Sequence, residues 1–185
     1  VEAVIFRYGQ RHAQEIEIAE KIASEAHVPF QVLDLSLLSQ LAPNSLTDAT
    51  IVMDEEQPAG SYPNTFVPGR NLLFLTFAAI VARSHGIFHI VTGVSEADYS
   101  GYPDCRDTFI LSANASINLA KDEHFQKHKP RMWRGKTGGW QLADELGVVD
   151  EGGRETPNCY NGIMGDGRGH WHAVQRRETG MEKVL

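Results

Sequence analysis

The sequence predicts an α/β fold built around a parallel sheet. A strand, an amphipathic helix and a second strand follow one another within the first 35 residues, which is the βαβ pattern. A third strand follows a strongly apolar helix and ends in a polar loop. Ligands in open α/β sheets bind outside the carboxyl ends of the strands, so that loop is the first place to look for a site.

The βαβ pattern occupies the N-terminal part of the chain. Residues 1–6 form a strand, and apolar residues at spacings of three and four predict an amphipathic helix over residues 11–26. Residues 27–29 end this helix at a proline, and residues 30–35 form a short apolar strand typical of a buried parallel sheet. The following segment, 41–70, holds four prolines and cannot form one regular element.

A second helix precedes the third strand in the sequence. Residues 72–84 are apolar nearly all round, which predicts a buried helix. Gly69 or Asn71 can cap its start, and Gly86 stops it. Residues 88–93 are then an apolar strand.

The last third of the chain is less regular. A helix is expected near residues 108–119, a basic connector over 127–134 and a short helix over 140–146. From there on the chain is rich in glycine and lacks periodicity. We therefore expect a domain over residues 1–150 and an irregular C-terminal appendage over residues 151–185.

Composition excludes several functional classes. The chain has 17 Lys and Arg against 24 Asp and Glu, a net charge of −7, which argues against general binding of nucleic acid or of an anionic membrane. Two cysteines are too few for a secreted disulfide scaffold and indicate a reducing compartment, by default the cytoplasm. The most apolar run, residues 72–82, is about half the ~20 residues that a membrane span needs.

The best candidate site is the loop over residues 92–107. It follows the carboxyl end of the third strand and holds four carboxylates, one guanidinium and two tyrosines. These groups suit recognition of a polar planar ligand. The alternative is a solvated acidic loop that caps the following helix. The candidate ligand-binding residues are Asp98, Tyr102, Asp104 and Arg106.

Two further segments carry candidates for anion binding. Arg70 stands at the start of the apolar helix, where backbone N–H groups and the helix dipole attract phosphate or carboxylate, although a surface arginine fits equally well. Lys136, ahead of a Thr-Gly-Gly run, is the second candidate anion contact, and a solvent-exposed lysine is the alternative.

The glycine-rich tail contains possible metal ligands. Cys159, His170 and His172 offer three groups that zinc accepts, while a closed structural site needs four. The alternative is a glycine-rich surface loop.

Four motifs, taken together, are more specific than any of these patterns. The runs FRYGQRH (6–12), NTFVPGRN (64–71), SGYPDCRD (100–107) and CYNGI (159–163) resemble successive motifs of the 7-cyano-7-deazaguanine synthase family. They occur in the family's order, and the similarity extends over nearly the whole chain.

The resemblance implies a fold, a reaction and a set of roles. It implies a Rossmann-like fold of the ATP pyrophosphatase type, a possible homodimer, and ATP-dependent conversion of 7-carboxy-7-deazaguanine and ammonia to the nitrile in queuosine biosynthesis. By the same resemblance, Arg70 and Lys136 face ATP phosphates or the activated acyl group, and Asp98, Asp104 and Arg106 line the deazaguanine pocket.

Several positions depart from the family's pattern. The sequence begins within a predicted strand at Val1. We therefore expect the family's first strand and its Ser-Gly-Gly-x-Asp-Ser phosphate loop to lie upstream. The family's four zinc-binding cysteines match Cys159, Arg168, Trp171 and Val174, so three ligands are lost and we expect little or no stoichiometric zinc.

Loss of the phosphate loop would remove the main ATP contact, which leaves two rival interpretations. One is a non-catalytic homologue that binds deazaguanine or serves as a scaffold. The other is a truncated copy of the enzyme without a function of its own.

Overall fold

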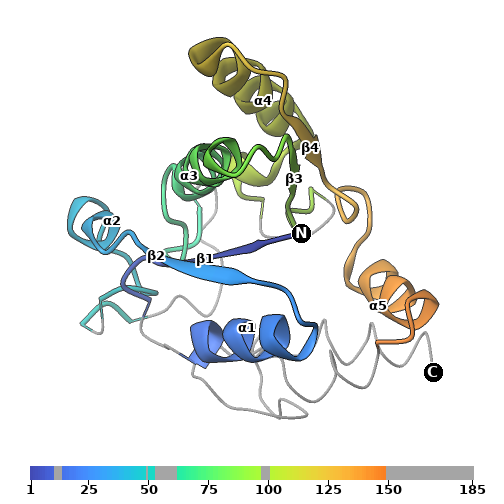
Figure 1. Ribbon diagram of the computed structural model, residues 1–185. Coiled ribbons are helices and arrows are strands. Elements are labelled where there is room, and N and C mark those ends of the chain that lie inside the picture. The colour runs from blue at the N-terminus through green and yellow to red at the C-terminus, as the bar shows by residue number, and fades with distance from the viewer. Residues whose placement is uncertain (11–13, 49, 53–61, 97–100, 149–185) are drawn as a thin grey trace. The chain divides into compact units, whose positions relative to one another are not determined.

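The computed structural model describes residues 1–10, 14–48, 50–52, 62–96 and 101–148. The chain divides into two compact units. One comprises residues 1–57 with 136–185, and the other comprises residues 58–135. Each contains a pair of parallel strands (Figure 1), so the predicted α/β class with parallel strands is confirmed.

The first unit contains the predicted βαβ motif. Strand β1 (Ala3–Arg7), helix α1 (Gln14–Glu25) and strand β2 (Phe30–Asp34) follow in order, and the two strands pair in parallel with Ala3 opposite Phe30. Helix α1 runs along one side of this strand pair in Figure 1. The connection between parallel strands is therefore the helical crossover that the sequence predicts.

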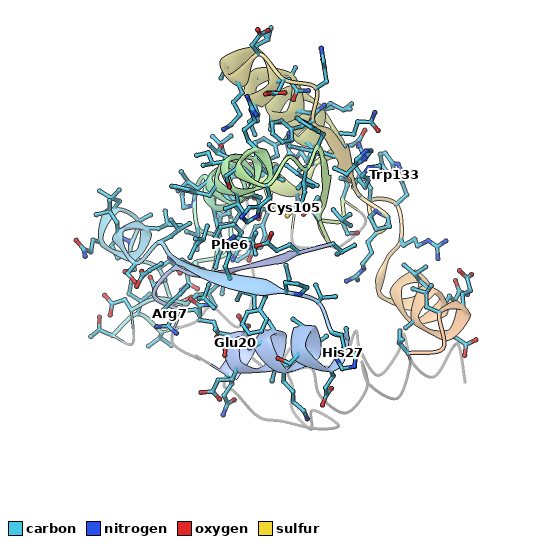
Figure 2. All side chains as sticks on the ribbon, in the orientation of Figure 1. Phe6, Arg7, Glu20, His27, Cys105 and Trp133 are labelled. Carbon is cyan, nitrogen blue, oxygen red and sulfur yellow. The ribbon has the colours of Figure 1, made fainter. Side chains whose placement is uncertain are left out.

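Helix α1 shows both the strength and the limit of periodicity. Ile16 and Ala23 are buried as their spacing predicts, but Ile22 is 41% exposed. Two residues after the helix ends at Glu25, His27 has a left-handed φ of 53°, and the N–H of Val28 donates to the Ala23 carbonyl at 2.8 Å. This is the hydrogen bond of a Schellman cap, and Figure 2 shows His27 at that end of α1.

Two short helices of this unit differ from the prediction. Helix α2 (Leu37–Leu41) lies where no helix was expected. Helix α5 (Lys136–Glu145) begins four residues before the predicted start and runs through Gly138 and Gly139. Each glycine costs a helix about 1 kcal/mol relative to alanine, which weakens α5 but does not prevent it.

The second unit carries the candidate site. It consists of α3 (Arg70–Ser84), β3 (His89–Val91), the 3₁₀ turn η1 (Pro103–Cys105), α4 (Asp107–Lys121) and β4 (Gln126–His128). Strands β3 and β4 pair in parallel, and both α3 and α4 pack against this strand pair. No helix in the described part of the chain is long and apolar enough to cross a membrane.

One apolar cluster holds the second unit together. The two helices contribute small and branched residues at spacings of three and four, and the strands and loops supply larger side chains. The buried members are Leu75, Ala79, Ala82, Ile90, Ile110, Ala113, Ile117, Phe125 and Met132. Burial of a side chain the size of Phe125 contributes about 1.5–3 kcal/mol, so this cluster fixes α3 and α4 on the strands.

Strand β4 was missed at the sequence level. Its last two residues fall at the start of the segment predicted as a basic connector, Gln126 precedes that segment, and all three residues are polar. The strand forms through its pairing with β3 and not through an apolar pattern of its own. Helix α3 also departs from expectation, because Leu72 and Ile80 are exposed and only one side of the helix is buried.

The end of α3 follows the prediction. Gly86 has a φ of +66°, and the N–H of Ile87 donates to the Ala82 carbonyl at 2.8 Å. Glycine adopts this left-handed conformation at no steric cost, so Gly86 is suited to end the helix.

Asn118 braces the turn that leads from α4 into β4. Its Nδ2 donates to the carbonyl of Phe125 at 3.1 Å, and its Oδ1 accepts the N–H of Phe125 at 2.8 Å. The side chain thus satisfies both backbone groups of the residue that places the largest ring in the core.

Asn118→Ala should lower the free energy of unfolding by about 1–3 kcal/mol, because two backbone groups lose their partners. Urea denaturation measures the change. Ser116→Ala, at an exposed position of the same helix, is the matched control and should be nearly neutral. Equal stability of the two variants would show that Asn118 does not brace the turn.

Candidate functional site

Two motifs that the sequence predicts separately meet at the N-terminal end of α3. Gly69, the residue before the helix, has a φ of 76° and offers no side-chain cap. The backbone N–H of Asn71 instead donates to Oδ2 of Asp104, in η1, at 3.1 Å. A carboxylate at this end of a helix satisfies a free N–H group and interacts favourably with the helix dipole.

The side chain of Asn71 reinforces the same contact. Its Nδ2 donates to the backbone carbonyl of Asp104 at 3.1 Å and lies 3.3 Å from Sγ of Cys105. Asn71 and Asp104 are both buried. Three hydrogen bonds therefore fix η1 against the first turn of α3, and Figure 2 labels Cys105 at this place.

An aromatic group lies beside this contact. The hydroxyl oxygens of Thr65 and Tyr102 are 2.6 Å apart. The ring of Tyr102 stacks on Phe66 with centroids 5.3 Å apart and planes 26° from parallel, and Tyr62 lies 5.0 Å from Phe66 on a tilted plane. The loop before α3 and the loop of η1 thus share one aromatic surface.

Tyr102 is held in its neutral form. Burial raises the pKa of its hydroxyl above the ordinary value of 10.0, while the hydrogen bond to Thr65 and the positive charge of Arg70 oppose the rise. At neutral pH this phenol can donate or accept a hydrogen bond without carrying charge.

Asp104 has one oxygen without a partner. Asp104 is only 6% exposed, and its Oδ1 is buried with no hydrogen-bond partner among the described residues. Buried carboxylate oxygens in native proteins are nearly always paired, so this atom is suited to accept an N–H group from a ligand.

A second set of contacts joins the loops that follow β3 and β4. The Oε2 of Glu96 accepts the N–H of Asp107 at 2.8 Å, and the N–H of Glu96 donates to the carbonyl of Met132 at 3.0 Å. Lys129 forms an ion pair with Asp107, and the hydroxyl of Ser95 donates to the carbonyl of Arg134 at 3.1 Å. The carboxyl ends of the two strands are therefore held together.

The structure places the predicted site residues in different parts of the fold. Tyr102 and Asp104 lie in the cluster, and Arg70 is the first residue of α3. Arg106 is exposed, one residue before α4. Lys136 begins α5, in the other unit.

Asp98 and Cys159 lie outside the described residues. Within the described part of the chain, no group of three or more His, Cys, Asp or Glu side chains is placed to hold a metal ion.

Two contributors were not predicted as site residues. Asn71 was expected only as a possible helix cap, and Thr65 was only part of a motif. Their role depends on contacts with residues 33 to 37 positions away in the chain, which local patterns do not reveal. The one sequence signal for these contacts was that the motifs over residues 64–71 and 100–107 occur together in this chain.

The arrangement suits a flat polar ring. It combines an aromatic surface, a hydroxyl pair and a buried carboxylate oxygen that receives no hydrogen bond from the described residues. Such a set can stack on a heteroaromatic base and accept one of its N–H groups.

Comparisons with known proteins agree with this chemistry. A family model described as queuosine biosynthesis protein QueC matches residues 1–185. The chain is 63% identical over 186 residues to a 7-cyano-7-deazaguanine synthase of Parabacteroides distasonis, and the match covers 100% of this chain and 83% of that relative.

Two further relatives carry the same name. The synthase of Phocaeicola vulgatus is 57% identical over 185 residues, with 100% of this chain and 83% of the relative covered. The synthase of Staphylococcus haemolyticus is 51% identical over 185 residues, with 100% and 82% covered.

Asn71→Ala should lower the free energy of unfolding by about 1–3 kcal/mol, because the Asp104 carbonyl loses its donor in a buried place. Asn71→Asp keeps the shape but sets a second carboxylate against Asp104, so at neutral pH it should be at least as destabilising. Urea denaturation of both variants provides the test. A stable Asn71→Asp variant would contradict the contact.

Proposed function

Because this chain belongs to the QueC family of queuosine biosynthesis proteins, we propose that it acts as a 7-cyano-7-deazaguanine synthase. In this reaction 7-carboxy-7-deazaguanine and ammonia give the nitrile, with ATP as the activating reagent. A carboxylate resists ammonia until its oxygen becomes a good leaving group, and ATP supplies that activation. The protein must therefore hold a flat base, bind anions and align the reacting groups.

The observation that carries the proposal is the buried Oδ1 of Asp104, which has no hydrogen-bond partner among the described residues. A deazaguanine ring presents N–H donors along one edge, and a buried carboxylate oxygen is the acceptor that such an edge requires. The stacked rings of Tyr102 and Phe66 supply an aromatic surface beside it. In this proposal Asp98, Tyr102, Asp104 and Arg106 line the base pocket.

Arg70 and Lys136 are proposed to bind ATP phosphates or the activated acyl group. Arg70 stands at the first position of α3, and Lys136 stands at the first position of α5, where the positive ends of helix dipoles favour anions. The Asn71 N–H at the start of α3 is already taken by Asp104. The guanidinium of Arg70 is therefore the main attraction for an anion at that helix.

The finer features of the family extend this proposal. We assign the chain a Rossmann-like fold of the ATP pyrophosphatase type, with a nucleotide and substrate domain over residues 1–150 and a C-terminal appendage over residues 151–185. A homodimer in the cytoplasm, acting on small molecules and not directly on nucleic acid, accords with the family and with the net charge of −7.

A non-catalytic deazaguanine-binding homologue is the rival function. Both hypotheses require Asp104 as the acceptor for the base. They differ in whether the chain forms a product when ATP is present. A synthase forms 7-cyano-7-deazaguanine, detectable by mass spectrometry, only when ATP and ammonia are present. A binder retains affinity for the base and forms no nitrile.

Asp104→Asn should weaken binding of 7-carboxy-7-deazaguanine by about ten- to hundredfold, the range expected for a lost hydrogen bond to a charged group. The asparagine oxygen can still accept the Asn71 N–H, while its amide places a donor where the ligand needs an acceptor. Titration calorimetry measures the affinity.

Asp122→Asn is the matched control for that experiment. Asp122 is exposed at the C-terminal end of α4, and asparagine tolerates its left-handed φ of 52°. This variant should bind like the parent chain. If Asp104→Asn also binds like the parent chain, Asp104 is not the acceptor for the base.

The purified chain should contain little zinc. Arg168, Trp171 and Val174 offer no zinc ligands, and Cys159 alone cannot hold the ion. Elemental analysis of the parent chain and of Cys159→Ala should give the same low content. One zinc ion per chain, lost in Cys159→Ala, would instead mean that His170 and His172 complete a different site.

A further inference from the structure

Arg131 lies in the turn that follows β4. The N–H of Met132 donates to the Lys129 carbonyl at 3.0 Å, and the N–H of Arg134 donates to the Arg131 carbonyl at 2.9 Å. These bonds give the turn a fixed backbone. Met132 is buried in the core, whereas Trp133 is 69% exposed and extends away from β4 in Figure 2.

The guanidinium of Arg131 has a buried donor without an acceptor. Its Nε is buried and has no hydrogen-bond partner among the described residues. A buried donor attached to a permanent positive charge is costly to leave unpaired. Such an atom is therefore either a destabilising feature or one half of a contact with a ligand.

Two acidic residues in the segments that contact this turn, Asp107 and Glu96, each have a partner of their own. Asp107 is paired with Lys129, and Oε2 of Glu96 accepts the Asp107 N–H. The N–H of Glu96 in turn binds the Met132 carbonyl, next to Arg131 in the chain. Arg131 is thus next in the chain to a cluster, formed by Glu96, Asp107 and Lys129, whose two carboxylates have other partners among the described residues.

The cluster occupies the place where α/β proteins bind ligands. It lies at the carboxyl ends of β3 and β4, and Asp107 follows the η1 residues of the candidate base pocket by two positions. A guanidinium there has the fork geometry that matches a carboxylate or a phosphate.

We infer that Arg131 binds an oxyanion of the reaction, either the carboxylate of the deazaguanine substrate or a phosphate of ATP. This inference rests on the proposed function and adds to it an anion-binding residue. The guanidinium holds the anion in place, and it neither gives up a proton nor forms a covalent bond.

The test is titration calorimetry of Arg131→Leu with three ligands: 7-carboxy-7-deazaguanine, 7-cyano-7-deazaguanine and ATP. The nitrile lacks the carboxylate, so its affinity should be unchanged and also reports that the variant is folded. The affinity for 7-carboxy-7-deazaguanine or for ATP should fall by about ten- to hundredfold, and the ligand affected identifies the oxyanion.

Two variants control for folding and charge. Arg131→Lys keeps the positive charge but loses the fork, so it should bind the same oxyanion with intermediate affinity. Lys121→Leu removes one positive charge from the last residue of α4 and should bind all three ligands like the parent chain.

The opposite result is equally definite. If Arg131→Leu binds all three ligands like the parent chain, the inference is wrong. A higher free energy of unfolding for that variant would then show that the buried guanidinium only destabilises the fold. Failure of the proposed function has a different signature: the parent chain itself binds neither deazaguanine, whatever residue stands at position 131.

Discussion

The carboxylate of Asp104 at the N-terminal end of α3 is the contact on which the candidate site depends. Gly69 gives the chain the left-handed turn that starts the helix, but it has no side chain to cap it. The acceptor must therefore come from elsewhere, and η1 supplies it from 33 positions further along the chain. The side chain of Asn71 makes two further contacts, with the carbonyl of Asp104 and with Sγ of Cys105. Neither loop can therefore move without breaking buried hydrogen bonds.

The remaining features of the site follow from this contact. Once η1 is fixed, Tyr102 stacks on Phe66 and shares a hydrogen bond with Thr65. Burial keeps Tyr102 neutral, and the buried Oδ1 of Asp104 has no hydrogen-bond partner in the part of the chain that the structure describes. A site of this kind gains most from a ligand that is flat and carries N–H groups, which agrees with the reaction of the family.

Local sequence patterns predicted much of the fold but not the pairing of the site. The apolar spacing of α1, the glycine after α3 and the βαβ order are local features, and they appear as predicted. Strand β4 was missed because its residues are polar and its structure comes from pairing with β3. Tyr102 and Asp104 were chosen by residue type, whereas their partners Thr65 and Asn71 are distant in sequence and could be found only in the folded chain.

The central claim is that the two loops joined by Asp104 form a single base-binding site. Hydrogen–deuterium exchange of the full chain, with and without saturating 7-carboxy-7-deazaguanine, tests it most directly. The account predicts that amides in residues 62–73 and 101–110 become protected together, because one ligand contacts both loops. Protection of only one of these segments, or of neither at saturation, would contradict it.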